Sequence, residues 1–151
     1  MSHIAMNFAP LRKRFFGILI DMLILLIICV PIGVSLGLID FDVDMRASYS
    51  YENEIILATI SSVAFLIING YFLAKRGQTI GKMWAGTKIV DSSGNKLKFV
   101  QVTLVRTIAF NFIGQIPLIG IIVATIDLLF VFSEEHRTLH DRLAGSYVVR
   151  A

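Results

Sequence analysis

The chain has 151 residues, of which 56% are hydrophobic and 17% are charged, and its formal net charge is +3 at pH 7. Soluble domains usually carry about a quarter charged residues and under half apolar ones, so this composition argues against a water-soluble domain and predicts an integral membrane protein. The basic residues flank the apolar stretches instead of sharing one face with aromatic residues, which argues against a nucleic-acid partner.

The first apolar stretch covers residues 15–39 and follows Arg12, Lys13 and Arg14. It exceeds the roughly 20 residues that cross a hydrocarbon core, and it has no clear small-x-small cleavage site. We therefore expect a retained membrane helix with a cytoplasmic N-terminus. Cys29 is the single cysteine, so an intramolecular disulfide and a cysteine-based metal site are both excluded.

The next segments alternate between polar and apolar character. Residues 40–54 are acidic and are expected to form an external loop, whereas 55–74 has spanning length and small residues that allow close helix approach. Residues 75–98 carry six basic residues against one acidic residue, which predicts a cytoplasmic loop. Within that loop, β-favouring runs on either side of DSSGN predict a small β-hairpin over 87–98.

Two further helices are predicted, over 99–115 and 117–133, before a charged cytoplasmic tail over 134–151. The helix over 99–115 contains Gln101, Arg106 and Asn111, so it is either a marginal membrane span or an amphipathic helix on the surface. The helix over 117–133 is apolar enough to span.

An internal repeat favours the spanning alternative. The segments QTIGKMWAGTKIV (78–90) and RTLHDRLAGSYVV (137–149) share the pattern T-[IL]-x4-AG-[ST] and a β-like tail, and each follows an apolar helix. Equivalent segments would lie on one face of the membrane, so the chain between them would cross it an even number of times.

We therefore expect one all-α integral membrane domain over residues 1–151. It would have four transmembrane helices, formed by a two-helix unit repeated in parallel, and both termini in the cytoplasm. The alternative has three transmembrane helices plus one interfacial amphipathic helix, with the C-terminus outside.

The pieces RFFGILID, GQTIGKMWAGTKIVDSSGNKL and RTLHDRLAGSYVV together resemble the RDD family of membrane proteins, named for an arginine and two aspartates. The resemblance covers nearly the whole chain. By position it implies that the arginine is Arg14, the first aspartate Asp21 and the second Asp141, with Asp127 as a rival for the second. It also implies a protein often credited with three membrane segments, for which transport of ions or small solutes is the usual conjecture.

Ionisable side chains inside the apolar helices are the candidate functional groups. Asp21 lies seven residues after Arg14, two helical turns, so both point to one face. An aspartate at mid-membrane depth costs about 2.5 to 3.5 kcal/mol on insertion scales, so Asp21 and Asp127 should face the protein interior. With four spans, Arg106 would have similar depth and could bridge the two carboxylates. Such a cluster either relays protons or binds a cation, or it neutralises itself and locks helix register.

The leading function is transport of a small ion or solute by a homo-oligomer, for example proton-coupled exchange of a monovalent cation. The alternative is a non-transporting scaffold whose repeated segments and basic cytoplasmic face bind anionic lipid or another protein. No nucleophile motif is present, and GQTIGK lacks the Walker spacing, so we expect no enzyme, no cofactor and no metal site. The candidate residues of the repeated segments are Thr79, Gly81, Lys82, Gly86, Thr138, His140, Asp141 and Gly145.

Overall fold

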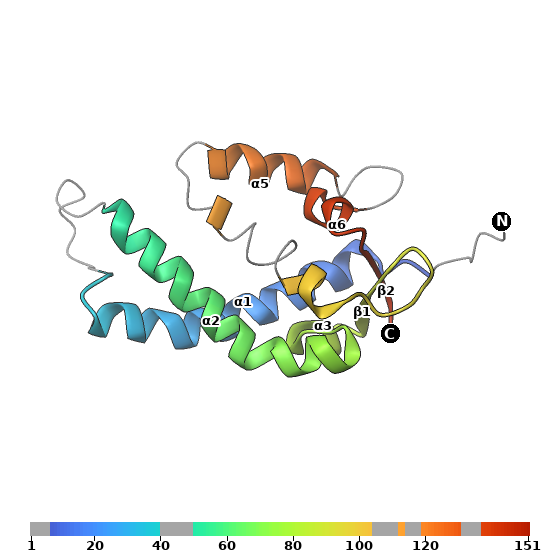
Figure 1. The fold of residues 1–151 in the computed structure, drawn as a ribbon, viewed down its shortest axis with the longest axis horizontal. Coiled ribbons are helices and arrows are strands. Elements are labelled where there is room, and N and C mark those ends of the chain that lie inside the picture. Colours follow the sequence, from blue (N-terminus) through green and yellow to red (C-terminus); the bar gives the residue numbers. More distant parts are fainter. Residues whose placement is uncertain (1–6, 40–49, 104–111, 114–118, 131–136) are drawn as a thin grey trace.

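The computed structural model describes residues 7–39, 50–103, 112–113, 119–130 and 137–151 (Figure 1). Two long helices come first, followed by shorter helices and two strands. In chain order the elements are α1 (Leu11–Ser35), α2 (Tyr51–Arg76), α3 (Ile80–Trp84), β1 (Thr87–Val90), α5 (Ile119–Phe130), α6 (Leu139–Leu143) and β2 (Tyr147–Arg150).

Helix α1 starts and ends four residues earlier than the predicted helix over 15–39. The basic residues before the apolar stretch form its first turn, because the helix begins directly after Pro10, whose φ of −62° suits a helix start. It ends where Gly37 adopts a φ of 67° and the Leu38 N–H donates to the Gly33 carbonyl at 2.8 Å. This left-handed residue is typical of a helix C-terminus.

Helix α2, Tyr51–Arg76, extends the predicted helix over 55–74 at both ends. Its first turn carries two glutamates and its last turn carries Lys75 and Arg76. These charges have the signs that favour each end of the helix dipole, so charged residues that were assigned to the loops belong to the helix. The helix ends at Gly77, which has a φ of 64°.

Among the described residues, α1 and α2 are the helices long and apolar enough to cross a membrane. Only 11% of the most apolar window of α1 and 17% of that of α2 is buried, whereas the core helix of a soluble protein would be mostly buried. The two helices contact each other and cross in Figure 1. The buried residues of α2 form one stripe along it, made of Ala58, Ser62, Asn69 and Leu73.

The strands β1 and β2 pair antiparallel, with Ile89 opposite Val148. The N-terminal segment lies along the other edge of β2, where Phe8 bridges Val149 and the Ala9 N–H donates to the Val148 carbonyl at 3.0 Å. The C-terminal strand β2 therefore lies between the N-terminal segment and β1 (Figure 1).

The predicted hairpin over 87–98 is present only as a turn with one antiparallel bridge, and β1 forms its ladder with β2. The turn itself is present, since the Asp91 carboxylate accepts two backbone N–H groups at 2.8 and 2.9 Å. The returning arm makes only an isolated bridge, between Val90 and Lys96. Its Leu97 is instead buried in the apolar core, which comprises Leu73, Ile89, Leu97 and Val102.

The predicted helices over 99–115 and 117–133 are described only in part. Residues 99–103 and 112–113 are helical, and α5 lies inside the second predicted range. Arg106 and Asn111 lie outside the described residues.

Candidate functional site

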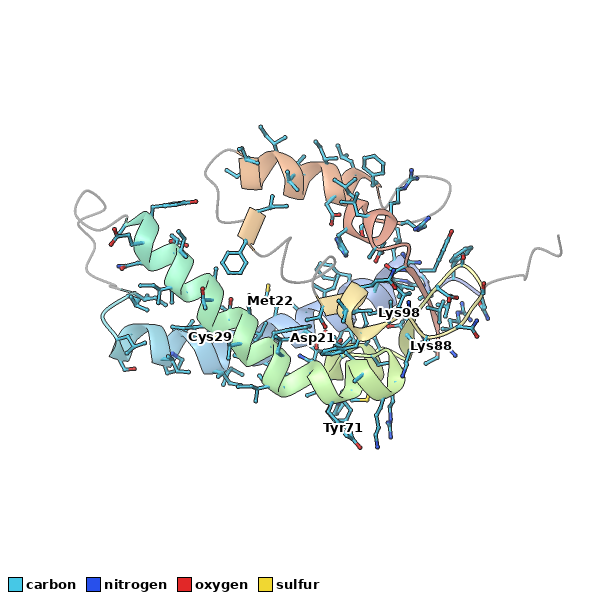
Figure 2. The ribbon with its side chains drawn as sticks, in the orientation of Figure 1. Asp21, Met22, Cys29, Tyr71, Lys88 and Lys98 are labelled. Carbon is cyan, nitrogen blue, oxygen red and sulfur yellow. The ribbon has the colours of Figure 1, made fainter. Side chains whose placement is uncertain are left out.

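Asp21 is buried, with 9% of its surface exposed, and its carboxylate binds the start of α3. One oxygen accepts the Thr79 hydroxyl at 2.5 Å and the other accepts the Gly81 backbone N–H at 2.8 Å. Figure 2 shows Asp21 in the half of α1 nearer the sheet, away from Cys29. A membrane-length helix thus supplies a charged cap to a short helix whose N-cap residue, Thr79, lies 58 residues further along the chain.

The other early N–H groups of α3 are capped as well. Thr79 is the N-cap residue, and its hydroxyl oxygen accepts the Lys82 N–H at 3.2 Å. The Ile80 N–H donates to the side-chain oxygen of Asn69, which lies on α2 and is 2% exposed. Because the first N–H groups of a helix have no partner within it, side chains from both long helices fix the position of α3.

Two glycines allow α3 to lie this close to α1. A Cβ added at Gly81 would lie 2.0 Å from the Gly17 carbonyl oxygen and 2.8 Å from the Asp21 carboxyl carbon. A Cβ at Gly17 would lie 3.2 Å from the Gly81 oxygen. Gly81 is therefore required for the backbone contact that brings its N–H to Asp21.

Asp127 makes the corresponding contact with α6. One of its carboxylate oxygens accepts the His140 backbone N–H at 2.9 Å, and the His140 Nδ1 lies 3.0 and 2.9 Å from the two oxygens. The other ring nitrogen, Nε2, lies 3.1 Å from the hydroxyl of Thr138, which caps α6. His140 stands two residues after its capping threonine, as Gly81 does after Thr79.

The remaining parts of the two repeated segments also share local geometry. Gln78 donates to the Thr87 carbonyl at 2.9 Å, and Arg137 donates to the Ser146 carbonyl at 3.1 Å. Gly86 and Gly145 both adopt a left-handed φ, of 64° and 61°, between the short helix and its strand. The glycines let the chain turn sharply at these points.

Asp141 is 2% exposed and lies in a different contact from Asp127. Its carboxylate accepts the Ser146 hydroxyl at 3.0 Å, and Arg137 donates to its backbone carbonyl at 3.2 Å. The Arg137 guanidinium also stacks over the Tyr147 ring, 4.0 Å from its centroid. Asp141 therefore ties α6 to the residue that precedes β2.

Arg14 is buried and joins α1 to the far end of the chain. Its Nε donates to the Ala9 carbonyl and its Nη2 to the Val148 carbonyl, both at 2.9 Å. An arginine that begins the first long helix thus holds the C-terminal strand.

A model of the RDD family matches residues 8–145, which is most of the chain. The chain belongs to the RDD family. The resemblance seen in the sequence is thereby confirmed, and together with two apolar helices of spanning length it identifies this RDD chain as a membrane protein. No curated protein and no solved structure matches it.

In the described part of this RDD protein, the two aspartates that we expected in one cluster with Arg106 bind different partners. Asp21 is bound by Thr79 and Gly81, whereas Asp127 is bound by His140. Arg106, the expected bridge, lies outside the described residues.

Lys82, a candidate residue of the first repeated segment, is buried, with 8% of its surface exposed. Sequence reasoning missed Asn69, although it is the single asparagine in the predicted helix over 55–74, a position where a polar group needs a partner. It also missed Arg137, whose position in the repeat matches Gln78.

Proposed function

We propose that the chain is a multi-pass protein of the cell membrane with both termini in the cytoplasm. The pairing of residues 7–9 with β2 supports this, because segments of one sheet lie on one side of a membrane and the chain between them must cross it an even number of times. Helices α1 and α2 would provide two crossings, and 99–115 and 117–133 two more. The basic first turn of α1 supports the cytoplasmic orientation.

The proposed architecture is a two-helix unit repeated in parallel. In support, α2 leads into α3 and β1 as α5 leads into α6 and β2. The helix before each short helix supplies a capping side chain, Asn69 from α2 and Asp127 from α5.

The proposed function is transport of a small ion or solute coupled to protons, carried out by a homo-oligomer because four short helices enclose little space. The contact between Asp127 and His140 carries this proposal. A carboxylate oxygen 2.9 Å from an imidazole nitrogen has the geometry in which a proton can pass between the two groups. Asp21 supplies another carboxylate, which is buried, and a monovalent cation is the substrate that such acids would suit.

The second candidate is a non-transporting scaffold that binds lipid or another protein. It is favoured by the fact that Asp21 and Asp127 both cap short helices. Helix capping is a structural role that requires no transport of ions. Each function makes a different prediction for substitutions that remove the negative charge at these two positions.

The deciding experiment measures internal pH in proteoliposomes challenged in turn with Na⁺, K⁺ and Li⁺ gradients. The variants are Asp21→Asn and Asp127→Asn, which keep an oxygen to accept the helix N–H. Asp91→Asn is the matched control, because Asp91 loses the same charge in an exposed turn.

Cation-dependent proton flux that is lost in the first two variants and kept in Asp91→Asn, with all three folded, would support transport. Absence of flux from well-folded wild type with all three cations would favour the scaffold.

A further inference from the structure

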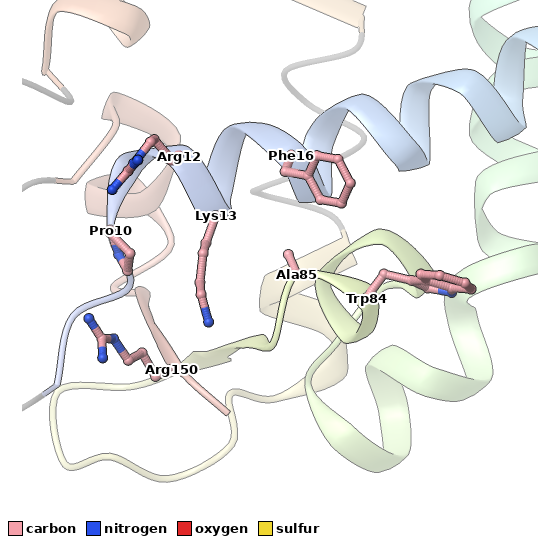
Figure 3. Close-up of a pocket in the computed structure, with 7 residues that line it drawn as sticks. All are labelled: Pro10, Arg12, Lys13, Phe16, Trp84, Ala85 and Arg150. Carbon is pink, nitrogen blue, oxygen red and sulfur yellow. The ribbon is translucent and has the colours of Figure 1, made fainter.

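A groove of about 640 Å³ lies between the start of α1, the end of α3 and the end of β2, apart from the two aspartate sites. Its lining combines three basic side chains with two aromatic ones, and none of the described residues that line it is acidic (Figure 3). The residues that matter for its chemistry are Arg12, Lys13, Phe16, Trp84 and Arg150.

The positive charge in this groove is not neutralised by the described part of the protein. The side chains of Arg12, Lys13 and Arg150 are exposed, and none of them makes an ion pair or hydrogen bond with a described residue. The first turn of α1 also has no acidic residue and no capping side chain, so its backbone N–H groups add positive potential. An anion is therefore the favoured occupant.

The other end of the groove is apolar and points to a lipid. Figure 3 shows the basic groups gathered at one end and Phe16 with Trp84 at the other. Phe16 is 52% exposed and Trp84 is 78% exposed, and Phe16 begins the apolar surface that continues along α1. Tryptophan prefers the headgroup level of a bilayer, so the arrangement matches a molecule with an anionic head and an apolar tail.

We propose that this groove is a binding site for the headgroup of an anionic phospholipid. Its phosphate contacts Arg12, Lys13 and Arg150, and its glycerol and upper acyl chain lie against Phe16 and Trp84. This assignment rests on the proposed placement of the α1 N-terminus at the cytoplasmic membrane surface. It differs from general attraction to a basic face, because other basic residues of that face, such as Lys98, do not line the groove.

The chain has a single tryptophan, so Trp84 reports directly on the groove. The full chain in detergent micelles is titrated with phosphatidylglycerol or phosphatidylcholine that carry bromine on their acyl chains, which quenches a nearby indole. The variants are Arg12→Gln, Arg150→Gln and the two combined. Lys98→Gln is the matched control, since it removes the same charge from an exposed position outside the groove.

Wild type is expected to be quenched at a lower mole fraction of the anionic lipid than of the zwitterionic one. Each groove variant should reduce this preference about fivefold, as expected for one basic residue near a charged surface, and Lys98→Gln should leave it unchanged. Unchanged thermal unfolding of the variants would show that their reduced preference for anionic lipid comes from the changed side chain and not from unfolding of the protein.

Equal quenching by both lipids, or an equal loss in Lys98→Gln, would overturn the proposal. Inorganic phosphate that relieves quenching at concentrations comparable to the lipid would identify a free anion as occupant and would also overturn it. The quenching requires no flux, so its failure is distinguishable from failure of the transport proposal.

Discussion

Ile89 and Val148 lie directly opposite each other in the two-stranded sheet, and each stands ten residues after the threonine that caps a short helix. Both are buried, with 2% and 3% of their surfaces exposed. Two similar segments therefore meet at equivalent positions, as expected if a local two-fold axis passes through this pair. The sheet is the junction between the middle and the end of the chain.

Cysteines placed in this register should form a disulfide. In a Cys29→Ser background, Lys88→Cys with Val149→Cys joins directly opposed residues, at a spacing that a disulfide can bridge. Lys88→Cys with Arg150→Cys is the control, because a shift of one residue turns the second side chain to the opposite face. Mass and gel mobility after mild oxidation would show the cross-link. Equal cross-linking of both pairs would contradict the register.

Gly81→Ala should destabilise the protein by about 1 to 3 kcal/mol, the usual cost of overpacking. The new methyl would lie 2.0 Å from the Gly17 carbonyl oxygen, so α3 must move away from Asp21. Gly70→Ala is the control, because its nearest neighbour would be a Phe99 ring atom at 3.9 Å. The free energy of unfolding of both variants is measured in detergent micelles, with Trp84 fluorescence as the signal. A Gly81→Ala variant as stable as wild type would disprove the close approach.

Asp21 and Thr79 should show energetic coupling in a double-mutant cycle. The single substitutions Asp21→Ala and Thr79→Ala each remove the 2.5 Å hydrogen bond, so the double variant should lose less than their sum, by about 0.5 to 3 kcal/mol. Thr138 caps the other short helix and provides the control. Asp21→Ala with Thr138→Ala should be additive within about 0.5 kcal/mol, and additivity in both cycles would argue against the Asp21 contact.

Asp127→Ala should be more destabilising than His140→Ala. The aspartate accepts both the backbone N–H and the ring of His140, whereas removing the ring leaves the backbone contact in place. The difference should be about 1 kcal/mol, the typical effect of a lost helix cap, and Asp127→Asn should fall between the two. Denaturant unfolding of the three variants tests this order. A His140→Ala variant as unstable as Asp127→Ala would show that the ring contact dominates.

Features that depend on neighbouring residues could be predicted from the sequence. The composition identified a membrane protein, and the apolar stretches located α1 and α2 to within a few residues at each end. The T-[IL]-x4-AG-[ST] pattern marked both short segments because a threonine that caps a helix and a left-handed glycine that ends it are local signals. The charge at the helix ends was visible but was assigned to the loops.

The tertiary structure decided which segments meet. The strand ladder of β1 forms with β2, and the adjacent arm makes only an isolated bridge, because Leu97 is buried in the core instead of extending a second strand. The partner of Asp21 is α3, because Gly17 and Gly81 allow two backbones to touch. These contacts join residues about 60 positions apart, as Asp21 and Gly81 are. Local hydropathy and spacing contain no information on how the long helices cross, and that crossing determines which buried polar groups can reach a partner.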